Sequence, residues 1–516
     1  MIDPATNRAA QILIVGGSVV GLAAALFLAQ RGTRVMLVEK RERREVHPRA
    51  RTFHERTIEL FRPTLAGPDV ERQGASVPQT GGGMLRTVSL ALPPDAWTPP
   101  NPALGQIDIS PAPFVYLGQD RLEPILLEAV RKLGVDVRLG CELISWREDV
   151  DGIEAELRDR NGNRSWVAAD YLVAADGTRS RVRERLGIAS LGAGVLGRNL
   201  SIVFEADLSE VVRKHPFDFA IITHPQAGGV IVTTDRPNRY IYAVTAAAHG
   251  GSIDDEGWAG LLRQATGLPE LEPVILGSFA WDVAESVAER FSVGRVFLCG
   301  DAAHQMPPAG GWGANVGIQD AANLAWKVDL VLRGRASPAL LGTYDAERRP
   351  VAAATAREAR LRAEQMRSSG EEPENSLAED GAVMLSYRYG DCEPIPQKLT
   401  LDAAPGRRAP HVWLQLNGER VSTIDLFGRG FVLLTASGRW RAAAEQVAAE
   451  FDVECACHVA AELRAPYAIG RGGGVLVRPD GVVSARWAHA PANRYRALSS
   501  AMKHALGWFD RDNPDE

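Results

Sequence analysis

A glycine-rich turn near the N-terminus of this 516-residue chain could hold a phosphate group. The sequence GGSVVG, from Gly16 to Gly21, follows residues 11–15, which have the pattern of a short buried strand. Glycine permits a tight turn between a strand and a helix, and the N–H groups at a helix N-terminus attract a pyrophosphate. Glu39 lies 18 residues after Gly21, where a carboxylate can accept hydrogen bonds from a ribose. This spacing predicts a dinucleotide site, whereas a glycine turn by itself would also suit an ordinary α/β fold.

Two further segments could bring polar groups to the same site. Asp176 and Gly177 follow an apolar run of residues 171–174, and taken alone the pair indicates only a turn. The second segment, LCGDAAHQMPPAGGWGAN, spans residues 298–315 and places Asp301 directly after another apolar run. A carboxylate in that position can reach a second sugar or a polyol hydroxyl.

The end of this second segment could border a ring system. Pro307 to Gly313 form a stiff loop, rich in glycine, before a helix that we expect to begin near Asn315. The N-terminus of such a helix stabilises negative charge, for example on a reduced ring system.

These motifs require elements that position them. Residues 11–39 predict a strand, the glycine turn, a helix and a second strand, which together form a βαβ unit. Short alternating runs between residues 192 and 282 predict a half-buried antiparallel sheet. Residues 318–366 have the pattern of long helices, and short strands and helices follow Pro396. The sequence therefore predicts an α/β protein.

Composition and charge limit the partners of this chain. The hydrophobic fraction of 45% and the charged fraction of 24% are those of a globular protein, and the length predicts two or three packed units. A formal net charge of −6 and a pI near 6.0 argue against nucleic acid as a partner. The longest early apolar stretch, Val19 to Ala29, is too short to cross a bilayer, so we expect no membrane segment.

The cysteines are sparse and odd in number, so they predict no disulfide framework. They are Cys141, Cys299, Cys392, Cys455 and Cys457. The last two lack zinc-like partner spacing, and no metal site is predicted. This cysteine usage favours a reducing compartment, and we expect a cytoplasmic protein.

In this order and separation, the three motifs resemble those of the class A FAD-dependent aromatic hydroxylases, which have the para-hydroxybenzoate hydroxylase fold. The chain looks closest to the phenol and aromatic-polyketide hydroxylases with a thioredoxin-like C-terminal domain, and the likeness covers essentially its whole length. It includes PRAR at residues 48–51, RTIEL at 56–60 and QDRLE at 119–123. The resemblance implies a Rossmann-like FAD-binding domain of three layers with a parallel sheet, an antiparallel-sheet substrate domain and a thioredoxin-like domain.

The C-terminal segment contains no Cys-x-x-Cys, so the resemblance implies no redox chemistry there. A structural role, or one in a homodimer, is expected instead. The expected divisions of the chain are residues 1–190 and 286–370 for the FAD-binding domain with a substrate-covering excursion at about 75–118, residues 191–285 for the substrate domain, residues 371–395 for a linker, and residues 396–516 for the thioredoxin-like domain.

The resemblance implies FAD as the cofactor and NADPH or NADH as the co-substrate, which must bind without a Rossmann domain of its own. The implied FAD-binding residues are Gly16, Ser18, Val19, Val20, Gly21, Glu39, Lys40, Arg49, Gln119, Arg121, Leu143, Asp176, Asp301, Gly313, Ala314 and Asn315. Arg51 is a secondary candidate beside Arg49. Ser18 stands where many members have glycine, and Trp312 stands where a smaller Phe is commoner.

The implied activity is that of an NAD(P)H-consuming monooxygenase, which hydroxylates a phenolic or polycyclic aromatic, polyketide-like substrate through a flavin C4a-hydroperoxide. Pro307 and Gly311 are the implied catalytic positions, in the loop beside the flavin ring. O2 and a small aromatic molecule are the remaining partners, and secondary metabolism such as antibiotic biosynthesis is the implied setting.

Two matters stay open in the sequence. Four side chains could serve as a general base, although each is more often structural: His224, Tyr240, Tyr242 and His304. A Baeyer–Villiger or epoxidising monooxygenase on the same scaffold and a non-catalytic flavin-binding partner protein are the alternative functions. A flavin halogenase should contain a Trp-x-Trp-x-Ile-Pro segment, and the chain has none.

Overall fold

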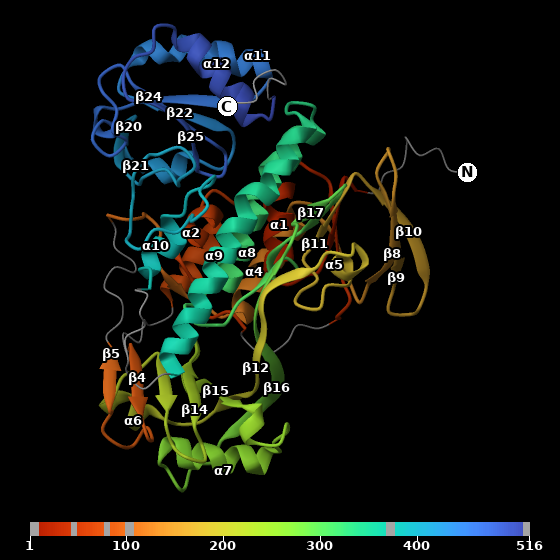
Figure 1. Cartoon of the computed structure of the whole chain (residues 1–516), viewed down its shortest axis with the longest axis vertical. Coiled ribbons are helices and arrows are strands. Elements are labelled where there is room, and N and C mark those ends of the chain that lie inside the picture. Colours follow the sequence, from red (N-terminus) through yellow and green to blue (C-terminus); the bar gives the residue numbers. More distant parts are fainter. Residues whose placement is uncertain (1–9, 43–48, 77–82, 99–107, 368–376, 509–516) are drawn as a thin grey trace.

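The computed structural model describes residues 10–42, 49–76, 83–98, 108–367 and 377–508. Its three parts follow one another along the long axis of the molecule (Figure 1). A parallel sheet with its helices lies in the middle, an antiparallel sheet lies at one end, and a C-terminal part lies at the other. Within the described ranges, no helix combines the length and the hydropathy of a membrane span.

The central sheet confirms the βαβ unit predicted for residues 11–39. β1 (Ile12–Val15) pairs in parallel with β2 (Val35–Glu39), and α1 (Val19–Ala29) connects the two strands. β1 is buried along its whole length because both faces of the sheet are covered, which is typical of parallel sheets. The strand order is β17-β18-β11-β1-β2-β7, in which β17 is Ser292–Val293, β18 Val296–Leu298, β11 Tyr171–Ala174 and β7 Asp136–Leu139.

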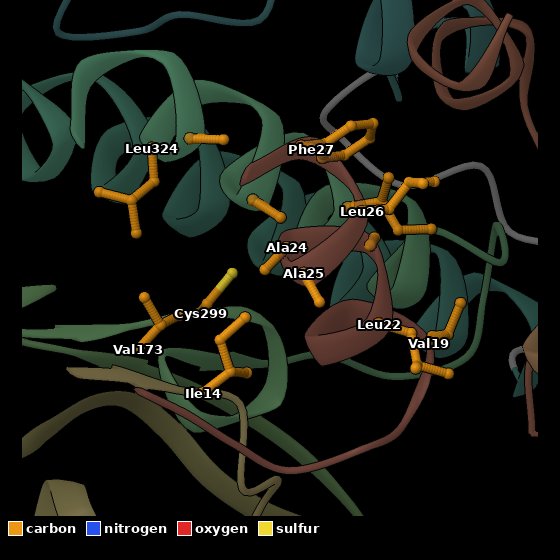
Figure 2. Close-up of a cluster of buried hydrophobic side chains, with 14 of the residues drawn as sticks. Ile14, Val19, Leu22, Ala24, Ala25, Leu26, Phe27, Val173, Cys299 and Leu324 are labelled. Carbon is orange, nitrogen blue, oxygen red and sulfur yellow. The ribbon is translucent and has the colours of Figure 1, made fainter. Parts of the chain in front are cut away.

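Helices cover one face of this sheet, and a small sheet lies on its other side (Figure 1). Ala24 and Ala25 of α1 lie close to Ile14 of β1 and to Leu324 of α8 (Figure 2). These short side chains let α1 pack closely between the sheet and α8. The further elements of these layers are α4 (Gln119–Lys132), α8 (Gly313–Leu332), α9 (Gly342–Arg367), β8 (Glu142–Glu148), β9 (Ile153–Arg158) and β10 (Arg164–Ala169).

The second sheet has eight strands and is antiparallel over most of its width, as the alternation between residues 192 and 282 predicts. Its order is β19-β16-β12-β15-β14-β13-β4-β5. Alternate residues of its strands, such as Tyr242, pack against Trp258 of α7. The bounds are β12 (Ser190–Glu205), β13 (Phe219–Ile222), β14 (Gly229–Thr233), β15 (Arg239–Thr245), β16 (Val274–Ala288), β19 (His304–Gln305), α6 (Ser209–Lys214) and α7 (Asp255–Thr266).

The excursion expected at about residues 75–118 is more regular than its composition indicates. β4 (Met84–Thr87) pairs in parallel with β13, and β5 (Ala96–Thr98) pairs with β4 at the edge of the eight-stranded sheet. Residues 77–82 and 99–107 lie outside the described ranges. The sequence analysis did not predict these two strands because both are short, and β4 joins the sheet through β13, about 135 residues further along the chain, as the pair Met84 and Phe219 shows.

The C-terminal part contains a four-stranded sheet of order β23-β22-β24-β25. β22 and β23 are parallel, whereas β24 and β25 are antiparallel to their neighbours, which is the strand arrangement of a thioredoxin-like fold. The bounds are β22 (Phe431–Thr435), β23 (Cys455–Val459), β24 (Gly474–Val477), β25 (Val483–Trp487), α11 (Arg441–Phe451) and α12 (Arg494–Ala505).

The linker expected at residues 371–395 is too wide. Residues 368–376 lie outside the described ranges, but the helix α10 (Asp380–Leu385) follows them. Its residues Ala382 to Leu385 are buried, and Val383 belongs to the core of the parallel-sheet part. The acidic residues before α10 suggested a linker. The short apolar run of α10 instead packs into the core of the parallel-sheet part, because burying it removes apolar surface from water.

A buried cluster of charges joins the C-terminal part to the short helix α2 (Glu55–Phe61). Glu59 accepts hydrogen bonds from both Nε and Nη2 of Arg408 and forms an ion pair with Arg56 at 3.2 Å. Burial by itself would raise the pKa of Glu59, but the guanidinium groups of Arg408 and Arg56 lower it to about 2 from 4.5. One carboxylate thus neutralises two buried arginines across the boundary between the parts.

We expect Glu59→Gln to destabilise the protein by about 3–5 kcal/mol at neutral pH, because two buried arginines lose their counter-charge. The folded pKa of Glu59 lies below the unfolded one. Its stabilising contribution is therefore complete above pH 4.5 and is lost as the pH falls towards 2. Thermal unfolding followed at several pH values tests this. The difference between wild type and variant should shrink below pH 4.5, and a constant difference would contradict the role of Glu59.

Candidate active site

The turn between β1 and α1 accepts only glycine at two positions. Gly16 has φ +110°, and a Cβ atom there would lie 2.1 Å from the carbonyl oxygen of Ala175. A Cβ atom at Gly21 would lie 1.9 Å from the carbonyl oxygen of Gly16. The glycine turn predicted from the sequence is therefore required by the close approach of three backbone segments.

The N-terminus of α1 is open to a ligand. Ser18 occupies the N-cap position, but its side chain does not cap the helix, and the first turn of α1 contains no acidic residue. The hydroxyl of Ser18 instead accepts a hydrogen bond from Gln119 and donates one to Glu123. The backbone N–H groups of Val19 and Val20 are thus left to bind an anion, as a pyrophosphate site requires.

Glu39 is held at the mouth of this turn. Its two carboxylate oxygens accept hydrogen bonds from the backbone N–H groups of Gly17, at 2.7 Å, and Arg41, at 2.9 Å. A cavity of about 60 Å³ lies beside it, and Ser18, Arg49 and Gln119 also line this cavity. The structure therefore brings together four of the residues that the sequence assigned to one site: Ser18, Glu39, Arg49 and Gln119.

Two weaker candidates lie beside the same end of β2. Lys40 follows Glu39 directly and is exposed. Leu143 is half-buried in β8, two residues after Cys141, whose N–H donates to the carbonyl oxygen of Glu39 at 2.9 Å. Contacts of Lys40 and Leu143 with a cofactor stay predictions.

The Asp301 motif meets the other side of the turn. A Cβ atom at Gly300 would lie 3.0 Å from the side chain of Val20, so this motif packs directly on the first turn of α1. Desolvation raises the pKa of the Asp301 carboxyl, whereas electrostatic interaction with His304 and Arg49 opposes the shift. Asp301 is therefore within electrostatic range of Arg49, which lines the cavity beside Glu39.

Asp176 carries an oxygen that is poised to accept a hydrogen bond. Its Oδ2 accepts from the N–H of Val182 at 3.3 Å, whereas its buried Oδ1 has no hydrogen-bond partner among the described residues. Burial raises the pKa of the Asp176 carboxyl, and a hydrogen bond from Ser180 opposes that shift. A buried acceptor without a partner is costly, so Oδ1 is suited to a ligand donor.

The loop from Pro307 to Gly313 leads into a second open helix N-terminus. Gly310 and Gly311 have φ values of +89° and +68°, which shape the turn before α8. α8 begins at Gly313, two residues before the predicted start, and its first turn has neither a capping side chain nor an acidic residue. The N–H groups of Gly313 and Ala314 can therefore face negative charge on a ligand ring.

Asn315 holds this loop rather than pointing at a ligand. Its Nδ2 donates to the carbonyl oxygens of Gly311 and Thr52, at 2.9 and 3.2 Å. Its Oδ1 accepts from the N–H of His54, at 2.9 Å, and from the hydroxyl of Thr57, at 2.7 Å. All four hydrogen-bonding positions of the amide are thus used within the protein. A contribution of Asn315 to a cofactor site would come through its backbone.

Two arginines have side-chain partners at the end of β14. Arg121 forms an ion pair with Asp235 at 3.2 Å and donates to the side chain of Gln73 at 2.5 Å. Arg51 donates to the carbonyl oxygen of Thr233 at 2.5 Å, and burial lowers its pKa to about 10. Both join the central part to the antiparallel sheet, and contacts of either arginine with a cofactor stay predictions.

The four candidate bases have structural partners. Nδ1 of His224 accepts from two turn N–H groups, and the Tyr242 hydroxyl donates to the carbonyl oxygen of Ala227 at 2.6 Å. Tyr240 packs on Phe204 on the side of the sheet that faces away from the central part, and burial raises its pKa. His304 is buried against Asp320 at 2.6 Å. None of the four is placed as a base.

Several functional positions were missed at the sequence level. Glu123 ties Ser18 to Gln119, and His54 and Thr57 hold Asn315. The helix α8 carries a buried polar stripe at helical spacing: Asn315, Gln319, Asp320, Asn323 and Lys327. Polar residues on an otherwise apolar helix face could have drawn attention to this stripe, because buried polar groups need partners.

The chain matches two known families of sequence. Residues 9–359 match the FAD binding domain family, and residues 402–509 match the family of aromatic-ring hydroxylase C-terminal domains. The chain belongs to the FAD-dependent aromatic-ring hydroxylases. This confirms the resemblance identified from the sequence, including FAD as cofactor, and the hydroxylase is a flavoprotein monooxygenase.

Named relatives align with the hydroxylase over nearly its whole length. It is 39% identical to the tetracenomycin B2 monooxygenase-dioxygenase of Streptomyces olivaceus, over 92% of this chain and 94% of the relative. It is 36% identical to the aklavinone 12-hydroxylase RdmE of Streptomyces purpurascens, over 96% and 98%. The crystal structure of aklavinone-11 hydroxylase in a ternary complex with FAD and aklavinone matches with a TM-score of 0.89 and 33% identity, over 97% of this chain and 99% of that one.

The residues of the hydroxylase fit FAD. A pyrophosphate and a reduced flavin ring suit the two open helix N-termini of α1 and α8. The ribose suits the carboxylate of Glu39 beside the first of them. The buried Oδ1 of Asp176, which has no partner among the described residues, can accept a further hydrogen bond from the cofactor. Glu39 would hold the adenosine ribose, and the first turn of α1 would hold the pyrophosphate. The loop from Pro307 to Ala314 would border the flavin ring, and we call it the flavin-side loop.

Glu39→Gln should weaken FAD binding by about tenfold, because the amide has one acceptor oxygen fewer and no charge for the ribose hydroxyls. Titration of the apoprotein with FAD, followed by flavin fluorescence, measures the dissociation constant. Glu128→Gln is the matched control, since Glu128 lies on the exposed face of α4 and pairs with Lys132. An unchanged constant in Glu39→Gln would place the ribose elsewhere.

Asn315→Ala should also weaken FAD binding by about tenfold, because four hydrogen bonds that hold the flavin-side loop are lost. The same titration measures the effect, and Asn161→Ala on an exposed turn is the control. If Asn315→Ala bound FAD like the wild type, the loop would be held without this side chain.

Proposed function

We propose that the hydroxylase inserts oxygen from O2 into a polycyclic, polyketide-like aromatic substrate, with NADPH or NADH as the electron source. The observation that carries this proposal is an apolar sheet surface on the side of the antiparallel sheet opposite α7. Its buried members are Val203, Val232 and Ile241, and half-buried neighbours packed against them include Phe219, Val230 and Phe279. We call this set the apolar face.

The apolar face looks towards the central part of the molecule. Tyr240 and Tyr242 alternate with Ile241 and pack on the α7 side, so Ile241 points the opposite way. Arg86 pairs with Ile221, which lies two residues from Phe219 and on the same side of the sheet. From that side, Arg86 donates a hydrogen bond to the carbonyl oxygen of Met366 in α9 at 3.2 Å. The apolar face therefore lies opposite the elements that surround the flavin-side loop.

An apolar wall of this kind suits a flat substrate of several fused rings. Burial of aromatic surface supplies most of the binding free energy in such pockets, and a few polar groups fix the orientation. Bound FAD supplies the redox chemistry, taking electrons from the nicotinamide and activating O2. The chain's own residues would bind and orient the substrate and keep water from the reacting atoms.

The names of the relatives support this substrate class. Aklavinone is bound in the similar crystal structure, and tetracenomycin and aklavinone appear in the names of the similar enzymes. The term monooxygenase-dioxygenase in one of these names favours a second outcome, in which more than one oxygen atom enters the product. Baeyer–Villiger or epoxidising chemistry would use the same surfaces and differ in the product formed.

Aerobic turnover of the FAD-loaded protein with NADPH, isotopically labelled O2 and a panel of mono- and polycyclic phenols tests the proposal. We expect a polycyclic phenol to gain one labelled oxygen atom, with little H2O2 released. A gain of further labelled atoms would indicate the dioxygenating outcome. NADPH oxidation that yields only H2O2 with every polycyclic compound would count against this substrate class.

Phe279→Asp should raise the KM of an accepted polycyclic phenol by about tenfold or more, because it places a charge on the apolar face. FAD binding should stay unchanged, since the substitution lies in the antiparallel sheet. Val150→Asp, at an exposed turn, is the matched control. An unchanged KM would remove the apolar face from the substrate site.

A further inference from the structure

The C-terminal part reaches the segment that carries Asp301 through one connected set of buried polar side chains. We call this set the buried network, and its members are His304, Asp320, Asn323, Lys327, Glu347, Arg348, Tyr389, Arg478 and Asp480. They come from the Asp301 segment, from α8 and α9, from the chain that follows α10, and from the turn after β24.

At its inner end, the network holds the segment that carries Asp301. Asp320 in α8 accepts from the backbone N–H of Gly300 at 3.3 Å and contacts Nε2 of His304 at 2.6 Å. Its other oxygen accepts from Nε of Arg348 at 2.8 Å. Asp320, His304 and Arg348 are all at most 1% exposed, so these contacts form without competing water.

Tyr389 connects the two halves of the network. Its hydroxyl accepts from Nη1 of Arg348 at 3.2 Å and from Nδ2 of Asn323 at 3.4 Å. The guanidinium groups of Arg348 and Arg478 lie 5.9 and 5.4 Å from the centre of its ring. The ring therefore lies within cation–π distance of one arginine from the central part and one from the C-terminal part.

At its outer end, Arg478 binds two carboxylates. It donates to Glu347 at 2.6 and 2.9 Å and to Asp480 at 2.6 and 3.0 Å. Glu347 also accepts from Lys327 at 2.8 Å. The network holds three bases (Lys327, Arg348, Arg478) and three acids (Asp320, Glu347, Asp480), so loss of one charge leaves another buried without compensation.

We propose that the C-terminal part fixes the segment that carries Asp301 through this network, with Arg478 and Tyr389 as positioning residues for FAD. Gly300 to Ala302 form only a short 3-10 turn, whose N–H at Gly300 is oriented by Asp320. Asp320 is in turn oriented by Arg348, and Arg348 by Tyr389. The C-terminal part thereby completes the cofactor site without a residue that touches FAD.

This inference rests on the proposed placement of FAD beside Asp301, and the experiment separates the two. The apo forms of the full chain are titrated with FAD, and their thermal unfolding is followed by tryptophan fluorescence. Stoichiometric binding by the wild type with loss of affinity in Asp301→Asn supports the placement. Without that loss, the placement fails and the network inference fails with it.

We expect Arg478→Met to raise the FAD dissociation constant at least about fivefold and Tyr389→Phe about threefold, with partial recovery in Arg478→Lys. Tyr387→Phe is the matched control for Tyr389→Phe, because Tyr387 is buried beside it but makes none of the hydrogen bonds of the network. Leu498→Ala, in the core of the C-terminal part, is the control for a general loss of stability. It should lower the melting temperature and leave the dissociation constant unchanged.

The combination of Arg478→Met with His304→Gln tests transmission through the network. If Arg478 and His304 act through the same network, the FAD dissociation constant of the double variant should be little higher than that of the single variant with the higher constant. Full additivity of the two effects would overturn the inference. It would equally be overturned if Arg478→Met lowered the melting temperature like Leu498→Ala while FAD bound normally.

Discussion

Two helices, α1 and α8, begin close together without capping side chains, and the need to bring these two open ends to one space organises the molecule. Both helix ends must face one space, so Val20 of α1 packs on Gly300 and Gly317 with no room for a Cβ atom at Gly317. The glycine turn, the parallel sheet beneath it and the loop before α8 all follow from bringing these two ends together.

The groups around that space are held by the protein rather than left to the ligand. Glu39 is oriented by two backbone N–H groups, Ser18 by Gln119 and Glu123, and Asn315 by segments from both sides of the loop. A site ordered in advance loses little conformational entropy when FAD binds. The same rigidity keeps the flavin-side loop in position opposite the apolar face, where substrate would lie.

Buried clusters of oppositely charged side chains lie where the central part meets the C-terminal part. Glu59 is shared by Arg56 and Arg408, and the buried network pairs three acids with three bases. Such clusters add little net stability compared with apolar packing. If the parts shift, however, a buried charge loses its partner, which is costly, so the clusters specify one arrangement of the parts. In this hydroxylase they connect the C-terminal part, which lacks a Cys-x-x-Cys, to the segment that carries Asp301.

Sequence alone determined the features that depend on local spacing. The glycine turn, the βαβ unit, Glu39 after the second strand and the long helices were predictable, because each is set by residues close together in the chain. The motif order was specific enough to identify the family. Tertiary structure decided the rest. It added β4 and β5 to the antiparallel sheet and placed α10 in the core. It also gave the side chains of Arg121, Arg51 and Asn315 protein partners that the sequence did not predict. These outcomes depend on residues that are distant in sequence, and local pattern carries no information about which of them will meet.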